Sequence, residues 1–264
     1  MPIVNQKCPW DTGVGEISVD VDLYVDDFDV APSDAVKVLF LCEPRSIIDF
    51  HHARKWLGWD TFKQFDHILT FDDEVLARCP NAHLFEFGST WIKDGFCLPK
   101  EFSVSFVCGN KRMAPGHALR HELWKSQSRI RNRRFFASRH GCPSGFDAPT
   151  LGDTKDTLFK SQFHVAIENS KINNYFSEKV MDCFVTRTVP IYWGCPNIGN
   201  YFNVDGMFLV DTAEDIVTVA NSLGAGTYDK MMPHVEDNFQ RAQKWKNLGG
   251  RLTEKIQQLI DVKL

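Results

Sequence analysis

Short apolar runs alternate with longer amphipathic stretches along this chain. Residues 36–42 form a nearly unbroken apolar run, which is typical of a strand buried on both faces of a parallel sheet, and residues 67–71 form a second such run. The aromatic-rich residues 50–65 between them can supply a crossover helix. The pattern therefore predicts a βαβ unit in the first third of the chain.

The same alternation continues after residue 100. The expected strands are residues 102–108, 135–137, 163–167, 189–193 and 207–210. The expected helices are residues 116–126, residues 153–160, a helix capped by Ser177, residues 212–223, and residues 235–264 with an interruption at Gly249 and Gly250. This order of elements predicts the α/β class, with two Rossmann-like doubly wound domains.

The turn-like Leu98-Pro99-Lys100 marks the expected boundary between two halves. We expect an N-terminal domain over residues 1–98, a second domain over residues 99–235, and a C-terminal helical segment over residues 236–264 that packs back on the first domain. Sheets of this kind bind ligands outside the carboxyl ends of their strands. We therefore expect the functional residues at the carboxyl ends of the strands.

Composition and charge narrow the function classes. The 264 residues are 43% hydrophobic and carry a formal net charge of −4, so the chain can bury a core and has no global attraction for nucleic acid or an acidic membrane. The basic residues from Arg129 to Arg139 lack a nucleic-acid-binding module and are better explained as a solvated face. Nucleic acid is therefore not an expected partner.

Cysteine usage and the N-terminus indicate the compartment. The eight cysteines contain no C-x-x-C pair, which disfavours a zinc ribbon or a redox motif and favours buried thiols. The first ten residues lack a basic start followed by an apolar stretch, and no run approaches the ~20 apolar residues that span a bilayer. We expect a cytoplasmic protein without a transmembrane segment.

Polar residues converge on the start of one predicted helix. Glu168-Asn169-Ser170 follows the strand at 163–167, and Ser177-Glu178-Lys179 opens the next helix. A helix N-terminus attracts anions, and Lys179 in its first turn opposes the helix dipole, so an anion is expected nearby. The alternative is that Glu178 completes a cap and Lys179 points into solvent.

A longer motif surrounds these residues. The stretch FHVAIENSKINNYFSEK, which ends at Lys179, is followed by TVPIYWG, ending at Gly194, and NYFN, ending at Asn203. Together they resemble the donor-binding motif of the α-1,3-fucosyltransferase family. Asn174 stands where the family has Asp, and Ser161-Gln162 where it has Tyr-Lys. The resemblance implies an inverting glycosyltransferase of GT-B architecture, with two domains facing a cleft, a nucleotide sugar held mainly by the C-terminal domain and an acceptor by the N-terminal one.

The resemblance also implies roles for five donor-binding residues. Lys179 would contact the donor diphosphate, Glu178 the ribose or sugar hydroxyls, and Asn169 and Tyr175 the same pocket. The stretch FVCGN followed by HALRHELW resembles the family's arginine element and matches its arginine to Arg120. Cations of this kind stabilise the charge that develops on a departing diphosphate. The alternative for Arg120 is an exposed helix residue.

The family's catalytic base follows an N-terminal strand, and Glu43 in VLFLCEP fits that element. A carboxylate at the end of a strand can take a proton from an acceptor hydroxyl. Alternatively, Glu43 is a surface turn residue, and Asp72, Asp73 or Glu74 after the next strand supplies the base.

Two D-x-D pairs, Asp20 with Asp22 and Asp27 with Asp29, raise the question of a metal. Both precede the first βαβ unit, and the alternating Asp residues over 17–30 are better explained as a strand or sheet edge with one solvated face. We therefore expect no metal site and no required cofactor, with divalent metal stimulatory at most.

The expected reaction transfers a sugar to a hydroxyl group of a glycan. The first choice of donor is GDP-fucose, which supplies L-fucose. Two alternatives remain open. One is a GT-B transferase that uses another nucleotide sugar such as UDP-xylose, since the residues that recognise guanine and fucose cannot be aligned. The other is a catalytically silent carbohydrate-binding relative.

Overall fold

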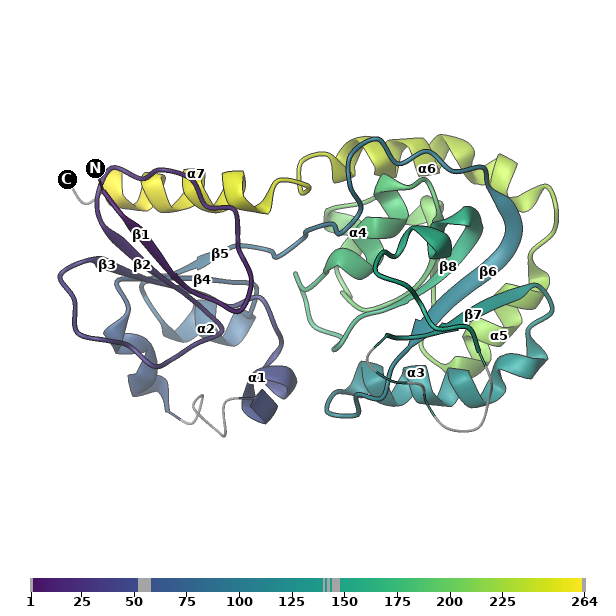
Figure 1. Cartoon of the computed structure of the whole chain (residues 1–264), viewed down its shortest axis with the longest axis horizontal. Helices are drawn as coiled ribbons and strands as arrows, with labels where there is room; N and C mark the ends of the chain where they lie inside the picture. The colour runs from purple at the N-terminus through teal and green to yellow at the C-terminus, as the bar shows by residue number, and fades with distance from the viewer. Residues whose placement is uncertain (1, 52–57, 140, 142, 144–147, 263–264) are drawn as a thin grey trace. The chain divides into compact units, whose positions relative to one another are not determined.

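The computed structural model describes residues 2–51, 58–139, 141, 143 and 148–262 and divides into two compact units (Figure 1). The N-terminal unit comprises residues 1–88, 172–175 and 247–264, and the C-terminal unit comprises residues 89–171 and 176–246. The division by contacts thus falls after Gly88 and Lys246, where the sequence analysis expects limits at residues 98 and 235.

The N-terminal unit is built on a five-stranded parallel sheet in the order β1-β2-β3-β4-β5. Its strands are β1 (Val4–Lys7), β2 (Val21–Val25), β3 (Val36–Phe40), β4 (His67–Thr70) and β5 (Ala82–Leu84). The strand order follows the chain, and all five carboxyl ends lie along one edge because every pairing is parallel. Strands β3 and β4 were expected from the sequence and β2 only as a strand or sheet edge, whereas β1 and β5 were not expected.

Helices cover both faces of this sheet. On one face, α7 (Leu248–Asp261) presents Leu248, Leu252, Ile256 and Ile260 to the apolar side chains of β2 and β3. On the other face lie α1 (Arg45–His51), the 3₁₀ helix η1 (Trp59–Gln64) and α2 (Asp73–Arg78). The middle of the expected crossover helix, residues 52–57, lies outside the described residues.

The strand expected over residues 17–30 is confirmed by β2, but its Asp side chains do not share one solvated face, because Asp22 is buried while Asp20 and Asp29 are exposed. Strand β2 is central because β1 pairs with its outer side, and Asp22 is only 5% exposed. Its carboxylate accepts hydrogen bonds from Asn5 Nδ2 (2.9 Å) and Ser33 Oγ (2.5 Å). A buried carboxylate can satisfy its oxygens in this way without facing water.

The C-terminal unit holds a second five-stranded parallel sheet, in the order β10-β9-β8-β6-β7. Its strands are β6 (Glu101–Cys108), β7 (Arg133–Ala137), β8 (Ser161–Ile167), β9 (Val189–Trp193) and β10 (Phe208–Leu209). The chain leaves β6 in one direction to β7 and then returns to the other side of β6 as β8. This reversal makes the sheet doubly wound and places the switch point between β6 and β8, where such sheets bind ligands.

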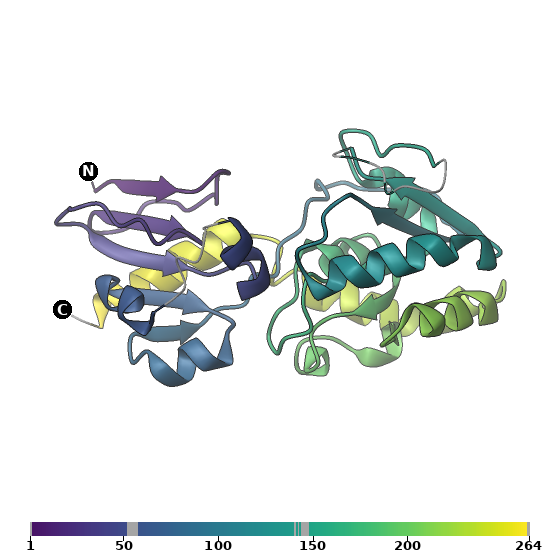
Figure 2. The same ribbon diagram turned by 90° about the horizontal axis from the view of Figure 1, so that it is seen from below.

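Helices also cover both faces of the second sheet (Figure 2). Helices α3 (Pro115–Ser126), α5 (Ala213–Ser222) and α6 (Thr227–Ala242) contribute to one apolar cluster, and α4 (Glu178–Val185) to the other. The helix expected over residues 153–160 is a 3₁₀ helix, η3 (Asp156–Lys160). None of the helices in the described part of the chain is long and apolar enough to cross a membrane.

The C-terminal helical pattern breaks earlier than expected. The gap between α6 and α7 spans residues 243–247, whereas Gly249 and Gly250 lie inside the first turn of α7. A Cβ on Gly249 would overlap the carbonyl group of Gly13. This glycine therefore permits close packing of α7 and does not end the helix.

Candidate active site

The switch point of the C-terminal sheet brings Arg120 to the end of β8. Arg120 on α3 donates from Nε and Nη2 to the carbonyl oxygen of Ile167 (3.2 and 2.5 Å) and from Nη2 to Asn169 Oδ1 (3.0 Å). Asn169 is buried, and Arg120 is half-buried. The guanidinium is therefore held at the carboxyl end of the strand, and the alternative of an exposed helix arginine was wrong.

Two glycines allow the backbone to close tightly around this strand end. A Cβ on Gly116, at the start of α3, would overlap the carbonyl oxygen of Glu168. A Cβ on Gly194, after β9, would lie 2.5 Å from Glu168 Cγ and would also meet the Tyr192 hydroxyl. The Glu168 side chain therefore packs here because residue 194 of the motif is a glycine.

Ser177 caps α4 and holds Glu168 at the same time. Its backbone N–H and its hydroxyl donate to the two carboxylate oxygens of Glu168 (2.9 and 2.6 Å), and its Oγ accepts from Lys179 N (3.4 Å). Burial raises the pKa of Glu168, while Lys179 and the Ser177 bonds oppose that shift. A buried carboxylate therefore supports the loop in front of α4.

Lys179 does not point into solvent, so the alternative of a solvent-exposed Lys179 was wrong. Its Nζ lies 3.0 Å from Ser177 Oγ, 3.1 Å from Glu178 Oε1 and 3.7 Å from Glu168 Oε2. The side chain is only 22% exposed. The ammonium group is therefore fixed at the N-terminus of α4, where the helix dipole alone would disfavour it.

Glu178 is buried between two lysines. Lys155, which the sequence analysis missed, places its Nζ 3.5 Å from Glu178 Oε1 and 3.2 Å from Asp182 Oδ2, and 4.0 Å from the ring centre of Trp91. Burial acts to raise the pKa of Glu178, but Lys179 and Lys155 outweigh it and hold that pKa well below its usual value. Glu178 is thus an ionised hydrogen-bond acceptor at neutral pH.

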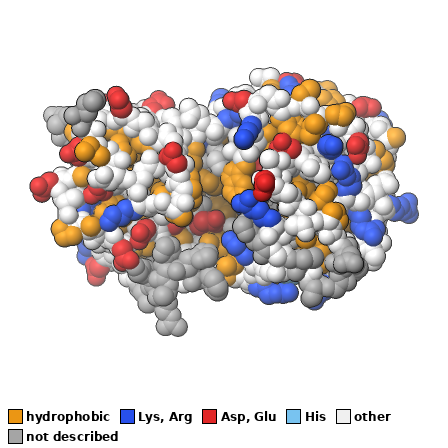
Figure 3. Space-filling model, viewed as in Figure 1, with side chains coloured by type: hydrophobic (Ala, Val, Ile, Leu, Met, Phe, Trp, Pro, Cys, Tyr) orange, Lys and Arg blue, Asp and Glu red, His pale blue; other side chains and the backbone are white. Residues whose placement is uncertain are grey.

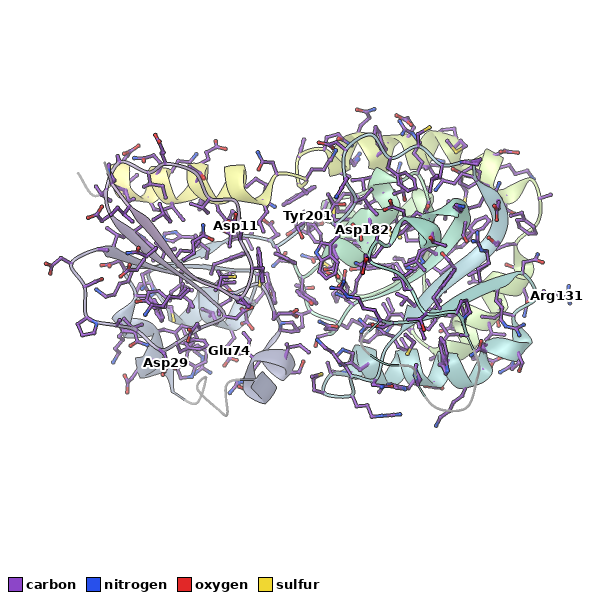
Figure 4. All side chains as sticks on the ribbon, viewed as in Figure 1. Asp11, Asp29, Glu74, Arg131, Asp182 and Tyr201 are labelled. Atoms are coloured by element: carbon purple, nitrogen blue, oxygen red, sulfur yellow. The ribbon has the colours of Figure 1, made fainter. Side chains whose placement is uncertain are left out.

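Asp182, on the next turn of α4, is fully buried and faces the interior of the C-terminal unit (Figure 4). It accepts hydrogen bonds from Thr90 Oγ1 and Trp91 N, both at 2.8 Å. These bonds and Lys155 tie the segment at residues 90–91 to the helix that carries Glu178 and Lys179.

Burial and the positive charges of the site lower the pKa of His117. Its pKa is lowered to about 3, first by burial and then by the charges of Arg120, Lys111 and Lys179. Arg120 on α3 and Lys179 on α4 therefore both lower the pKa of His117, although they belong to different helices. Basic side chains are also frequent on the face of the C-terminal unit visible in Figure 3. No spacing in the sequence singles out His117 or Lys111.

Glu43 lies in the N-terminal unit, just past the end of β3. It is half-buried, and its Oε2 accepts a hydrogen bond from the Tyr175 hydroxyl (3.4 Å). Tyr175 is itself buried and packs on Phe71, with ring centres 4.8 Å apart. Tyr175 was expected in the donor pocket, and within the N-terminal unit it contacts the candidate base.

The alternative bases after β4 each have a structural partner. Asp72 caps α2 through Glu74 N and Val75 N, and Glu74 pairs with Arg78 (2.8 Å). Asp73 accepts hydrogen bonds from Asn173 and Asn174, both at 3.2 Å. Each of these acids therefore has a structural contact, as Glu43 has with Tyr175.

The bond to Asp73 also explains the departure of Asn174 from the family's pattern. Asn174 has a φ of 61°, in the left-handed region that asparagine tolerates, and its amide donates to Asp73 Oδ1. An aspartate at this position would place two like charges together. The substitution therefore matches its surroundings in this chain.

Within the described residues, no group of three or more His, Cys, Asp or Glu side chains could hold a metal ion. Asp20 accepts from Ile3 N (2.8 Å), and Asp27 from Asp29 N (2.9 Å).

Most of the described cysteines are buried free thiols, as the sequence predicts: Cys42, Cys79, Cys108, Cys183 and Cys195. Cys97 is exposed, Cys8 is half-buried, and Cys142 lies outside the described residues.

The fold is that of GT-B glycosyltransferases, as the likeness to solved structures shows. A crystal structure of an α1,3-fucosyltransferase with GDP-fucose aligns with a TM-score of 0.53, covering 88% of this chain and 78% of that one, at 16% identity. The HepE protein of Anabaena in complex with UDP-glucose aligns with a TM-score of 0.55 over 84% of this chain and 72% of that one, at 8% identity. The predicted α/β class with two parallel-sheet domains is confirmed.

Sequence comparison identifies the family that the motif resembles. Residues 141–225 match the model of the C-terminal domain of glycosyltransferase family 10 (fucosyltransferase). The α-(1,3)-fucosyltransferase FucT of Helicobacter pylori is 37% identical over 58 residues, which make up 20% of this chain and 12% of that protein. The predicted resemblance to α-1,3-fucosyltransferases is thus confirmed, and the match spans about an eighth of the curated relative.

Proposed function

We propose that this chain is an inverting glycosyltransferase that transfers L-fucose from GDP-fucose to a hydroxyl group of a glycan. The observation that carries the proposal is the set of motif residues held at the carboxyl end of β8 and the start of α4: Arg120, Asn169, Glu178 and Lys179. The GDP-fucose complex of a protein with this fold supports the choice of donor.

The proposed task of Arg120 and Lys179 is to stabilise the leaving nucleoside diphosphate. The diphosphate gains negative charge as the glycosidic bond breaks, and fixed cations that already face this position lower the barrier without reorganising. Glu178, ionised between two lysines, would accept hydrogen bonds from hydroxyl groups of the donor. The two cations take the place that a divalent metal occupies in other transferases, so we propose that none is required.

Glu43 is the proposed general base. It would take the proton of the acceptor hydroxyl as that oxygen attacks the anomeric carbon from the side opposite the diphosphate. Backside attack inverts the anomeric centre and separates the base from the leaving-group cations. The proposal assigns the base to the N-terminal unit, to which Glu43 belongs, and the leaving-group cations to the C-terminal unit, to which Arg120 and Lys179 belong.

A donor panel tests the proposal. Thermal unfolding is measured with GDP, UDP, GDP-fucose and UDP-sugars, because a ligand that binds only the native state raises the melting temperature. We expect GDP and GDP-fucose to raise it and the uridine compounds to leave it unchanged, followed by release of GDP when a glycan is added. Stabilisation by UDP alone would assign another nucleotide sugar. Stabilisation by glycans without turnover of any donor would indicate a silent binding relative.

A further inference from the structure

The end of strand β2 departs from ordinary strand geometry at Asp26. Its φ is 51°, in the left-handed region, and its N–H still donates to the carbonyl oxygen of Phe40 on β3 (2.9 Å). Beyond this point β2 no longer runs beside β3, whose pairing ends at Val25 and Phe40. The backbone N–H groups of Cys42 and Glu43 therefore need another acceptor.

The Asp26 carboxylate supplies that acceptor. Its Oδ1 accepts from Cys42 N (2.9 Å) and Glu43 N (3.3 Å), and its Oδ2 accepts from the Cys42 thiol (2.9 Å). Three donors from two consecutive residues thus converge on one side chain. Asp26 thus holds the backbone of the turn that carries Glu43, and the Glu43 carboxylate accepts a hydrogen bond from Tyr175.

The hydrogen-bond partners of Asp26 are the Cys42 thiol and two backbone N–H groups, and the charge that acts on its pKa is that of Glu43, which is negative. The titratable groups around it are Cys42 and Glu43 at the end of β3 and Cys8 at the end of β1, with Asp11 beside Cys8. Burial raises the pKa of Asp26 to about 7, the Glu43 charge adds to this shift, and the hydrogen bonds from Cys42 and Glu43 oppose it. Asp26 thus gains its charge near neutral pH.

We propose that Asp26 is a positioning residue for Glu43, which holds the turn of the candidate base and does so more strongly when ionised. The inference rests on the proposed function of Glu43. Hydrogen bonds to a charged acceptor are about twice as strong as those to a neutral one, so deprotonation of Asp26 tightens the bonds from Cys42 N and Glu43 N. Misplacement of a base by a fraction of an ångström slows proton transfer without weakening donor binding.

Asp26→Asn tests this role, because asparagine keeps an acceptor oxygen and mimics the protonated acid at every pH. We expect kcat to fall about 10-fold at pH 8, with the KM for the donor and the affinity for GDP unchanged. At pH 6, where most Asp26 of the natural enzyme is protonated, we expect the two enzymes to differ by less than about 3-fold. Equal ratios at both pH values would show that the carboxylate charge has no role.

Asp22→Asn is the matched control. Asp22 is a buried acid on β2, the strand that Asp26 follows, and it is held by Asn5 and Ser33. Its loss should lower the melting temperature and leave the pH profile of kcat unchanged. If Asp22→Asn alters the profile in the same way as Asp26→Asn, the effect comes from general loosening of the sheet and the proposal is overturned.

A double-mutant cycle separates this inference from the proposed function. If Glu43 is the base and Asp26 acts through it, Asp26→Asn should add no further loss of kcat in the Glu43→Gln background. A full additional loss there would show that Asp26 acts independently of Glu43. Unchanged activity of Glu43→Gln alone would instead reject Glu43 as the base, whatever Asp26 does.

Discussion

Replacing Lys179 by alanine tests the proposed diphosphate site most directly. The ammonium group is fixed by Ser177 and Glu178 at the N-terminus of α4, so a bound diphosphate would meet it without reorganisation. A hydrogen bond to a charged group contributes about 1.5–3 kcal/mol. We therefore expect Lys179→Ala to weaken GDP binding about 10- to 100-fold.

The same change also removes a structural charge. Glu168 is fully buried with Lys179 Nζ at 3.7 Å, and the loss of that cation leaves a carboxylate whose pKa is already raised by burial. Removing one partner of a buried pair costs about 3–5 kcal/mol, and the two Ser177 bonds to Glu168 reduce this to an expected loss of about 1–3 kcal/mol. A drop in affinity could thus follow from loosening of the loop.

A double variant, Lys179→Ala with Glu168→Gln, separates the two effects. Glutamine is neutral and keeps an oxygen that can accept from Ser177 N. We expect it to recover most of the lost stability in thermal unfolding without ligand, while calorimetry with GDP still shows the weakened affinity. Lys179 is not the diphosphate cation if Lys179→Ala binds GDP as tightly as the natural chain, or if the double variant recovers affinity together with stability.

Four further outcomes are expected. Glu43→Gln, which keeps the shape of the side chain and removes its basicity, should lower kcat about 10²–10⁴-fold at nearly unchanged donor affinity; an active variant rejects Glu43 as the base. Excess EDTA should leave most of the turnover intact, and loss that Mn²⁺ restores would reverse the proposal that no metal is required. Gly194→Ala should cost about 1–3 kcal/mol of stability and weaken GDP binding, because its Cβ lies 2.5 Å from Glu168 Cγ; normal stability in urea unfolding contradicts this packing. Asp26→Asn should remove a pH dependence of stability: the folded-state pKa of Asp26 is raised to about 7, so the natural chain loses stability as pH rises from about 4 to 7 and the variant does not, and a melting temperature that falls equally in both proteins argues against the shift.

Apolar periodicity predicted five of the interior strands and the edge strands β7 and β10, and it missed the edge strands β1 and β5. Strands β3, β4, β6, β8 and β9 are buried runs that no other element type explains equally well. Strand β1 has the mixed sequence VNQK, and its pairing with β2 is a property of the tertiary fold that no local pattern records. Asp22 is buried for the same reason, since its partners Asn5 and Ser33 are distant in sequence.

The motif predicted where the candidate site lies in the sequence. The contacts that other segments make to the site residues could not be predicted from the sequence. The cap at Ser177 and the cations Arg120 and Lys179 follow from local spacing and from the resemblance. Lys155 reaches Glu178 from a separate segment, and this contact depends on how η3 packs near α4. His117 was missed because its lowered pKa arises from burial and from charges on other elements.

The stretch between Glu168 and Lys179 serves both units of the molecule, and this limits how it can vary. Residues 172–175 leave the C-terminal unit and pack with the N-terminal one, where Asn174 binds Asp73 and Tyr175 binds Glu43. The chain then returns to form the α4 cap that holds Lys179. One short loop therefore carries a contact to the candidate base and, a few residues later, the proposed diphosphate cation. A substitution within this loop therefore alters the surroundings of both groups at once, whatever the identity of the donor sugar.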